Sequence, residues 1–283
     1  MSEPIVYLNG EYLPVDQAKV PVLDRGFIFG DGIYEVIPVY GGTLFRLEEH
    51  LIRLDNSLQA VRISNPFKHS EWQEMLESLL QKNSGTDQSV YVQITRGVAQ
   101  RDHGFPENTQ PTIFAMVNPL ITPTVDALQQ GISAITVNDI RWQNCHIKAI
   151  ALLPNILMRQ QALDKGATEA IMIRDGNVTE GAASNIFVIK DGIIRTPPKS
   201  NHLLPGITRD LVVELAHANE LPCEEVSISE AELNNADEIW LTSSTKEIMP
   251  VTQLNDNIRN DGQPGPVWQQ MYAIFQEYKA SLR

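Results

Sequence analysis

The most distinctive candidate for chemistry in this sequence is Lys148, which lies within the apolar stretch 145–153. The stretch reads Cys-His-Ile-Lys-Ala-Ile-Ala-Leu-Leu, and no other lysine has so long an apolar setting. Loss of hydration favours the neutral, nucleophilic form of an amine, which suits a lysine that forms a Schiff base. The alternative is a lysine at the end of a strand whose side chain reaches back to water.

Three further segments could bind a ligand. Glu180 lies among small residues before an apolar run, where a carboxylate either caps a turn or contacts a closely approaching group. The run Leu204–Arg209 opens a predicted helix, whose unpaired N–H groups and the Thr208 hydroxyl could bind a phosphate. Four consecutive hydroxyl residues, including Ser243 and Ser244, follow Leu241. The alternative for Leu204–Arg209 is an ordinary helix start, and the alternative for the hydroxyl run is a solvated turn.

Other common chemistries lack their motifs. Gly30-Asp-Gly32 has no third glycine at the dinucleotide spacing, and no phosphate-binding G-x-x-x-x-G-K-[ST] loop occurs. The six histidines form no H-x-x-x-H pair, and no G-x-S-x-G elbow is present. We therefore expect no dinucleotide site, no metal and no serine hydrolase chemistry.

Composition limits the partners. The 283 residues include 22 Lys and Arg against 35 Asp and Glu, a formal charge of -13 that repels nucleic acids and anionic lipid surfaces. A content of 42% hydrophobic and 20% charged residues predicts a folded globular chain. With only two cysteines and no apparent signal peptide, we expect a cytoplasmic protein without disulfides.

The elements that must position these candidates form two parts of mixed structure. In the first, Asn9-Gly10 predicts a tight hairpin, and Gly41-Gly42 predicts a second one. Leucines at helical spacing from Leu47 predict one amphipathic helix, and Ser70 with Gln73 resembles the capping box of another. Two strands then follow, at 90–94 and 112–117.

A run containing two prolines, 118–124, is the best linker candidate. We therefore predict a small N-terminal domain over 1–118, a linker over 119–126 and a larger C-terminal domain over 127–283. Strands and helices do not alternate regularly in the C-terminal part, which favours an α+β fold over a doubly wound sheet. Its predicted strands are 132–137, 169–173, 185–189 and 238–242, and its predicted helices are 155–165, 207–219 and 266–278.

Taken together, these segments resemble the class IV, fold-type IV pyridoxal-phosphate aminotransferases over nearly the whole chain. The most specific part is a spaced signature that runs from Glu180 through Asn185-Ile-Phe and Thr196 to Leu204-x-Gly-Ile-x-Arg209. The run Asp24–Glu35 also resembles the N-terminal loop of this family. The resemblance implies a small N-terminal α/β sandwich domain and a larger C-terminal mixed α/β barrel-like domain.

The resemblance also implies roles for individual residues. Lys148 would hold pyridoxal 5'-phosphate as a Schiff base, the internal aldimine, and would act as general acid and base. Glu180 would face the pyridine nitrogen and favour its protonation. The cofactor phosphate would be bound by Arg53, the backbone N–H groups of Ile207 and Thr208, and the hydroxyl of Ser243 or Ser244.

A third motif selects a subgroup of the family. Arg101-Asp-His103 most resembles the R-x-H carboxylate trap of D-amino-acid aminotransferases, in which this loop comes from the neighbouring subunit of a homodimer. Tyr34, Arg101 and His103 would then bind the substrate α-carboxylate. The predicted reaction is amino transfer from D-alanine or D-glutamate to a 2-oxo acid such as 2-oxoglutarate or pyruvate.

The match has departures and rivals. Ala182-Ala183, Phe27 and Pro205 stand where D-alanine aminotransferases have serines, a tyrosine and a lysine, which affects substrate preference more than cofactor use. An aminodeoxychorismate lyase-like enzyme would keep Lys148 and Glu180 but eliminate pyruvate, and the R-x-H motif argues against it. An L-branched-chain aminotransferase would carry an N-terminal arginine-proline pattern that is absent here. A protein that only stores pyridoxal phosphate is the non-enzyme alternative.

Overall fold

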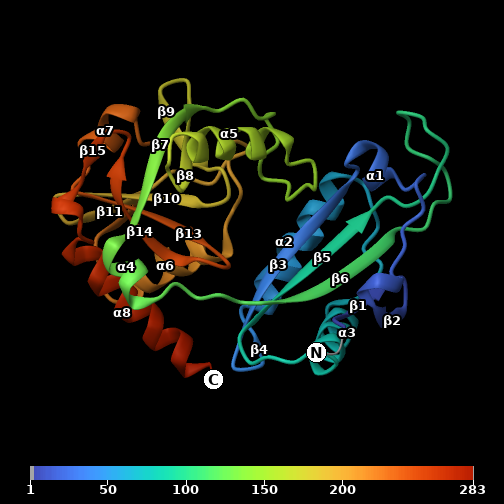
Figure 1. The fold of residues 1–283 in the computed structure, drawn as a ribbon. Helices are drawn as coiled ribbons and strands as arrows, with labels where there is room; N and C mark the ends of the chain where they lie inside the picture. The colour runs from blue at the N-terminus through green and yellow to red at the C-terminus, as the bar shows by residue number, and fades with distance from the viewer. Residues whose placement is uncertain (1–2, 283) are drawn as a thin grey trace. The chain divides into compact units, whose positions relative to one another are not determined.

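The computed structural model describes residues 3–282, and the chain divides into two compact units (Figure 1). Unit 1 comprises Met1–Ile121 together with Ile147–Leu152, and unit 2 comprises Thr122–His146 and Leu153–Arg283. The short segment that contains Lys148 therefore packs with unit 1, although the chain on both sides of it belongs to unit 2.

Unit 1 is built on an antiparallel sheet with the strand order β2-β1-β6-β5-β3-β4. The predicted Asn9-Gly10 hairpin is confirmed: both residues have positive φ, 49° and 101°, as a two-residue turn between twisted strands requires. Gly41-Gly42 makes the second predicted hairpin. The strands are β1 Ile5–Leu8, β2 Glu11–Pro14, β3 Gly32–Tyr40, β4 Thr43–Leu44, β5 Gln88–Thr95 and β6 Thr112–Pro119.

Two amphipathic helices, α2 (Leu47–Ala60) and α3 (His69–Gln81), pack against this sheet through their apolar stripes. Leu51, Leu54 and Leu58 recur every three or four residues and are all buried, because that spacing places them on one face of α2. Each fully buried leucine stabilises the fold by roughly 1.5–3 kcal/mol. Two shorter helices complete the unit, α1 (Arg25–Phe29) and the 3-10 turn η1 (Val15–Gln17).

The predicted capping box of α3 is wrong. The helix begins at His69, so Ser70 lies inside its first turn instead of before it. The Glu71 carboxylate instead accepts a hydrogen bond from the Lys68 backbone N–H at 2.7 Å. An ionised carboxylate is the stronger acceptor for an unpaired N–H group, and this decides where the helix starts. Gln73 donates along the helix to Glu77.

Unit 2 holds a mixed sheet with the order β12-β11-β10-β13-β14-β7-β8-β9, and β15 pairs with β14. The sheet curls, because its terminal strand β9 leads through a tight turn directly into β10, which lies well inside the strand order. The mixed, barrel-like architecture expected for this part is confirmed. The strands are β7 Ile132–Asn138, β8 Glu169–Arg174, β9 Asn177–Gly181, β10 Asn185–Lys190, β11 Ile193–Thr196, β12 Cys223–Glu225, β13 Glu238–Ser243, β14 Glu247–Leu254 and β15 Asn257–Ile258.

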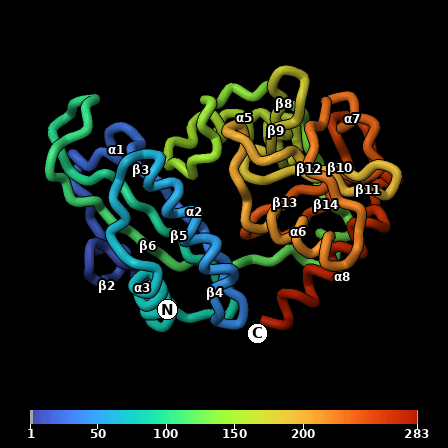
Figure 2. The backbone as a smooth tube through the Cα atoms, turned by 180° about the vertical axis from the view of Figure 1, so that it is seen from behind, coloured from blue at the N-terminus to red at the C-terminus, as the bar shows by residue number. Residues whose placement is uncertain are grey.

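Helices cover this curled sheet, and α6 packs against both α8 and β13 (Figure 2). Pro266 occupies the first turn of α8, where its missing N–H costs no helical hydrogen bond. Among residues 3–282, no helix is both long and apolar enough to cross a membrane. The helices are α4 Val125–Gln130, α5 Leu153–Asp164, α6 Ile207–Ala218, α7 Glu230–Asn234, the 3-10 turn η2 Asn260–Gly262 and α8 Pro266–Ser281.

Candidate functional site

Lys148 lies beside the first residues of β3 in unit 1. Its carbonyl oxygen accepts a hydrogen bond from the Tyr34 backbone N–H at 2.9 Å, and its own N–H donates to the Ser57 hydroxyl at 3.3 Å. The Lys148 Nζ atom lies 4.2 Å from the centroid of the Tyr34 ring, where the π face attracts a cation. The fold thus brings together two residues that the sequence predicted for the site.

Arg53 is buried on α2 and is held by a carboxylate from β3. Its Nε and Nη2 atoms donate to the two oxygens of Glu35 at 2.8 and 2.7 Å, and His50 Nδ1 lies 2.8 Å from the same carboxylate. Burial acts against ionisation of Glu35, but Arg53 and His50 together hold its pKa far below the ordinary range. This buried pair fixes the orientation of the Arg53 guanidinium group.

Arg101 and His103 lie in the exposed loop between β5 and β6, and both contact Phe29 at the end of α1. The Arg101 guanidinium carbon is 5.3 Å from the centroid of the Phe29 ring, and the His103 ring centroid is 5.5 Å from it. The two members of the predicted R-x-H motif therefore share one aromatic platform. Two cationic or hydrogen-bonding groups held side by side can bind a carboxylate.

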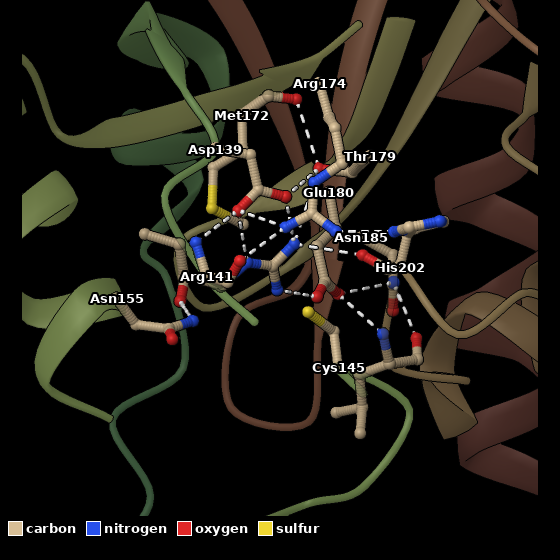
Figure 3. Close-up of polar contacts among 12 residues, drawn as sticks. Asp139, Arg141, Cys145, Asn155, Met172, Arg174, Thr179, Glu180, Asn185 and His202 are labelled. Atoms are coloured by element: carbon tan, nitrogen blue, oxygen red, sulfur yellow. Dashed lines mark hydrogen bonds and ion pairs between the residues drawn. The ribbon is translucent and has the colours of Figure 1, made fainter. Parts of the chain in front are cut away.

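Glu180 lies on β9 in unit 2 and is only 5% exposed (Figure 3). One of its oxygens forms an ion pair with Arg141. The other accepts hydrogen bonds from the Leu204 backbone N–H at 3.0 Å and from the Asn185 amide at 3.2 Å. The Asn185 amide also donates to the Leu204 carbonyl at 2.9 Å. Three residues of the spaced signature are therefore in direct contact.

Arg141 is the main site residue that the sequence interpretation missed. It follows β7 and donates to Asp139 from Nε at 2.9 Å and from Nη2 at 2.8 Å, while Arg174 approaches the same carboxylate at 3.1 Å (Figure 3). Burial disfavours the charged form of Arg141, but the nearby Asp139 and Glu180 carboxylates together raise the pKa of Arg141 above its ordinary value. The only indication of this role in the sequence is the pattern Asp139-Ile-Arg141 directly after a predicted strand, and this pattern belongs to no known motif.

The ionisation of Glu180 reflects two opposed effects. Burial raises its pKa to about 7, whereas the Arg141 charge and the Leu204 N–H group act in the opposite direction. An additional positive charge nearby would favour the ionised form of Glu180, because Arg141 and the Leu204 N–H group replace only part of the hydration that the carboxylate loses on burial.

The amino end of α6 carries Ile207 and Thr208, both buried. The residue that precedes them, Gly206, provides no side-chain cap, and the first N–H groups of a helix are suited to bind an anion. A Cβ atom on Gly206 would lie 2.0 Å from the Asn185 side-chain oxygen, so this position tolerates glycine alone.

Ser243 ends β13, and Ser244 lies in the turn that follows. The Ser243 hydroxyl accepts a hydrogen bond from the Lys246 backbone N–H at 3.2 Å and retains its own proton for another acceptor. The neighbouring Thr242 hydroxyl is buried and has no hydrogen-bond partner within residues 3–282. An unsatisfied buried hydroxyl is costly, which indicates that this strand end binds a polar group.

The predicted site residues thus fall into two sets, one in each unit. Unit 1 contains Tyr34, Arg53, Arg101, His103 and Lys148. Unit 2 contains Glu180, Ile207, Thr208, Ser243 and Ser244.

Comparison with known proteins identifies the family. Residues 32–254 match the family described as amino-transferase class IV. The chain belongs to the class IV aminotransferases, a family of pyridoxal-phosphate enzymes. It is 40% identical to the D-alanine aminotransferase of Bacillus licheniformis over 96% of this chain and 95% of the relative, and 39% identical to that of Staphylococcus aureus over 96% and 97%.

Solved structures confirm the expected fold type. A branched-chain amino acid aminotransferase of Escherichia coli superimposes with a TM-score of 0.93 at 28% identity, covering 98% of this chain and 94% of that one. The branched-chain aminotransferase of Thermoproteus uzoniensis with norvaline gives a TM-score of 0.90 at 26% identity, with the same coverage. The curled sheet of unit 2 and the smaller unit 1 are therefore the fold-type IV architecture.

The residues present fit pyridoxal 5'-phosphate. A phosphate suits the uncapped amino end of α6 and the unsatisfied Thr242 hydroxyl beside Ser243. A protonated ring nitrogen suits the buried Glu180 carboxylate, and Lys148 supplies a half-buried amine.

We predict that Glu180 makes the stability of the cofactor-free protein depend on pH. Because its pKa of about 7 in the folded state exceeds the ordinary 4.5, the folded protein binds this proton more tightly than the unfolded chain. The resulting stabilisation is present at low pH and is lost as pH rises toward 7. Glu180→Gln removes this titration. The free energy of unfolding of the variant, measured by urea denaturation, should therefore increase relative to that of the wild type by about 2 kcal/mol between about pH 5 and about pH 8. A difference that stays constant would show that Glu180 is ionised throughout.

Proposed function

We propose that this protein transfers the amino group of D-amino acids, of the D-alanine and D-glutamate type, to a 2-oxo acid such as 2-oxoglutarate or pyruvate. The observation that carries this proposal is the pair Arg101 and His103 on the Phe29 ring, which presents two groups suited to an α-carboxylate. The extent of identity to D-alanine aminotransferases, 40% over nearly the full length, supports the same reaction. Lower identity, 28%, separates the chain from the branched-chain enzyme of Escherichia coli.

Pyridoxal 5'-phosphate, when bound, supplies an aldehyde that captures amino groups and a ring that withdraws electrons from the substrate Cα. We assign to Lys148 the amine that holds the cofactor and the base that removes the proton from Cα. The Tyr34 ring beneath its Nζ atom restricts where this amine can move. Partial burial favours the neutral form of an amine that both tasks need, and Lys148 is half-buried.

Glu180 would hold a proton on the pyridine nitrogen by opposite charge. Arg141 would keep this carboxylate oriented and favour its ionised form, because its guanidinium group is itself held by both oxygens of Asp139. The orientation of Glu180 is set further by the Leu204 N–H and the Asn185 amide.

The phosphate would be bound by charge and by N–H groups. Arg53, oriented by Glu35, would provide the cation, and the Ile207 and Thr208 N–H groups would provide the helix amino end. Hydroxyl donors would come from Ser243 or Ser244. The substrate α-carboxylate would be bound by Tyr34, Arg101 and His103.

We also propose that the protein is a homodimer in which the Arg101–His103 loop serves the site of the neighbouring subunit. Large apolar side chains are exposed in the loop, in α1 and just before α1, notably Phe105 at 56%, Phe27 at 76% and Val22 at 71%. Exposed apolar residues in one region favour coverage by a second copy. The free Cys145 and Cys223 support a reducing, cytoplasmic location.

A substrate assay tests the proposed reaction against its rivals. D-alanine with 2-oxoglutarate should give pyruvate and D-glutamate, and when 2-oxoglutarate is omitted no more than one pyruvate per active site should form. L-leucine should react at least about 100-fold more slowly, since discrimination by placed polar contacts commonly exceeds this factor. Pyruvate from aminodeoxychorismate without an acceptor would identify a lyase, preferred use of L-leucine would identify a branched-chain enzyme, and no turnover would identify a storage protein.

Lys148 is predicted to be the residue that carries the cofactor. Borohydride reduction of the purified holoenzyme should fix pyridoxal phosphate to this lysine, because reduction converts a Schiff base to a stable amine. Peptide mapping by mass spectrometry locates the label, and Lys246 serves as an internal control in the same digest. A label on Lys246 or another lysine would remove Lys148 from its catalytic role.

Arg101→Ala should raise KM for the D-amino acid and for the 2-oxo acid alike, since both present an α-carboxylate. Loss of a charged hydrogen bond costs about 1.5–3 kcal/mol, which corresponds to roughly 10- to 150-fold in kcat/KM. His103→Ala should have a smaller effect, because it removes one hydrogen-bonding group and leaves the Arg101 charge in place. Steady-state kinetics with each substrate varied in turn measure both. An increase in KM for only one of the two substrates would contradict a shared carboxylate site.

A further inference from the structure

A compact ion network lies next to the loop that carries Arg101 and His103. The Asp31 carboxylate accepts hydrogen bonds from Arg25 Nε at 2.8 Å and from Arg96 Nε and Nη2 at 2.8 and 2.9 Å. The side chains of Arg25 and Arg96 are only 4% and 7% exposed. A buried cation requires an anionic partner, so a single carboxylate keeps both arginines in place.

Both arginines also contact the loop, one on each side of His103. Arg25 Nη1 donates to the Asp102 carbonyl oxygen at 2.6 Å, and the Arg96 guanidinium carbon lies 3.8 Å from the centroid of the Phe105 ring. The hydrogen bond from Arg25 reaches the backbone of the residue between Arg101 and His103. By holding the backbone at Asp102, this hydrogen bond constrains the orientation of the Arg101 and His103 side chains.

The aromatic platform of the motif belongs to the same assembly. Phe29 lies one helical turn after Arg25, whose guanidinium carbon is 4.8 Å from the centroid of the Phe29 ring. Arg25 thus touches the loop backbone and the ring against which Arg101 and His103 rest. At the base of the loop, a Cβ atom on Gly97 would lie 1.9 Å from the Gln110 carbonyl oxygen, so the two ends of the loop meet closely.

We propose that Arg25, anchored by Asp31, is a positioning residue that fixes the backbone at Asp102 and so keeps Arg101 and His103 together for binding an α-carboxylate. This inference rests on the proposed function, because it assumes that Arg101 and His103 bind substrate. It assigns a role to a buried arginine that contacts neither substrate nor cofactor in the scheme above.

Arg25→Lys is the sharpest test, because lysine keeps the positive charge beside Asp31 but lacks the planar fork that reaches Asp31 and Asp102 together. In the holoenzyme, KM for D-alanine and for 2-oxoglutarate should each rise about tenfold, while kcat stays within about twofold. On an Arg101→Ala background, Arg25→Lys should add less than about twofold to KM, because residues that act through one contact are not additive. A full additional tenfold on that background would overturn the proposal.

Trypsin cleavage of the holoenzyme after Arg101 gives a readout that does not depend on activity. Arg25→Lys leaves the number of trypsin sites unchanged, and it should speed cleavage between Arg101 and Asp102 by about threefold or more, because the loop opens more often. Cleavage within residues 153–282 should not change. Arg195→Lys, which alters an arginine paired with Glu224 on β11 and β12 of unit 2, is the matched control and should change neither KM nor cleavage after Arg101.

Unchanged cleavage after Arg101 in the Arg25→Lys variant would overturn the positioning role. A wild-type enzyme that does not turn over D-amino acids would instead refute the proposed function, and the cleavage comparison would still decide whether Arg25 holds the loop.

Discussion

The structure depends above all on the need of buried charges for partners of opposite charge. In unit 2, Glu180 is buried on β9, and its ion pair with Arg141 is possible only because Asp139 holds that arginine from a different strand end. Leaving either charge without its partner would cost several kcal/mol. The chain must therefore bring β7, β9 and the segment around Leu204 together, and this requirement links the curled sheet to the geometry of the site.

Unit 1 contains two clusters in which a carboxylate pairs with buried cationic side chains. Glu35 holds Arg53 and His50 on α2 against β3, and Asp31 holds Arg25 and Arg96 next to the exposed loop. In each case a carboxylate without a direct chemical role fixes the orientation of the cationic side chains beside it. A protein of formal charge -13 can in this way hold positive charge at defined places in its structure.

These anchors explain how a family fold serves a particular reaction. Cofactor chemistry needs an amine, a carboxylate for the ring nitrogen and an anion site for the phosphate. In the proposed site these would be positioned by the segment beside β3, by β9 and by the amino end of α6. In the proposed function, the choice among amino acids would depend instead on the loop between β5 and β6. Loops of this kind can change sequence without disturbing the sheet that supports them, so the fold alone does not define the substrate.

The sequence by itself determined the hairpin at Asn9-Gly10, the apolar faces of α2 and α3, four of the strands of unit 2 and the family to which the chain belongs. These depend on turn chemistry and periodicity within a few residues, or on a spaced signature that can be recognised directly. Only the tertiary structure decided that Ile147–Leu152 packs with unit 1, and that Arg141 pairs with Glu180 across 39 positions. Such contacts join residues distant in the chain, and their energy depends on burial, which no local pattern of residue types specifies.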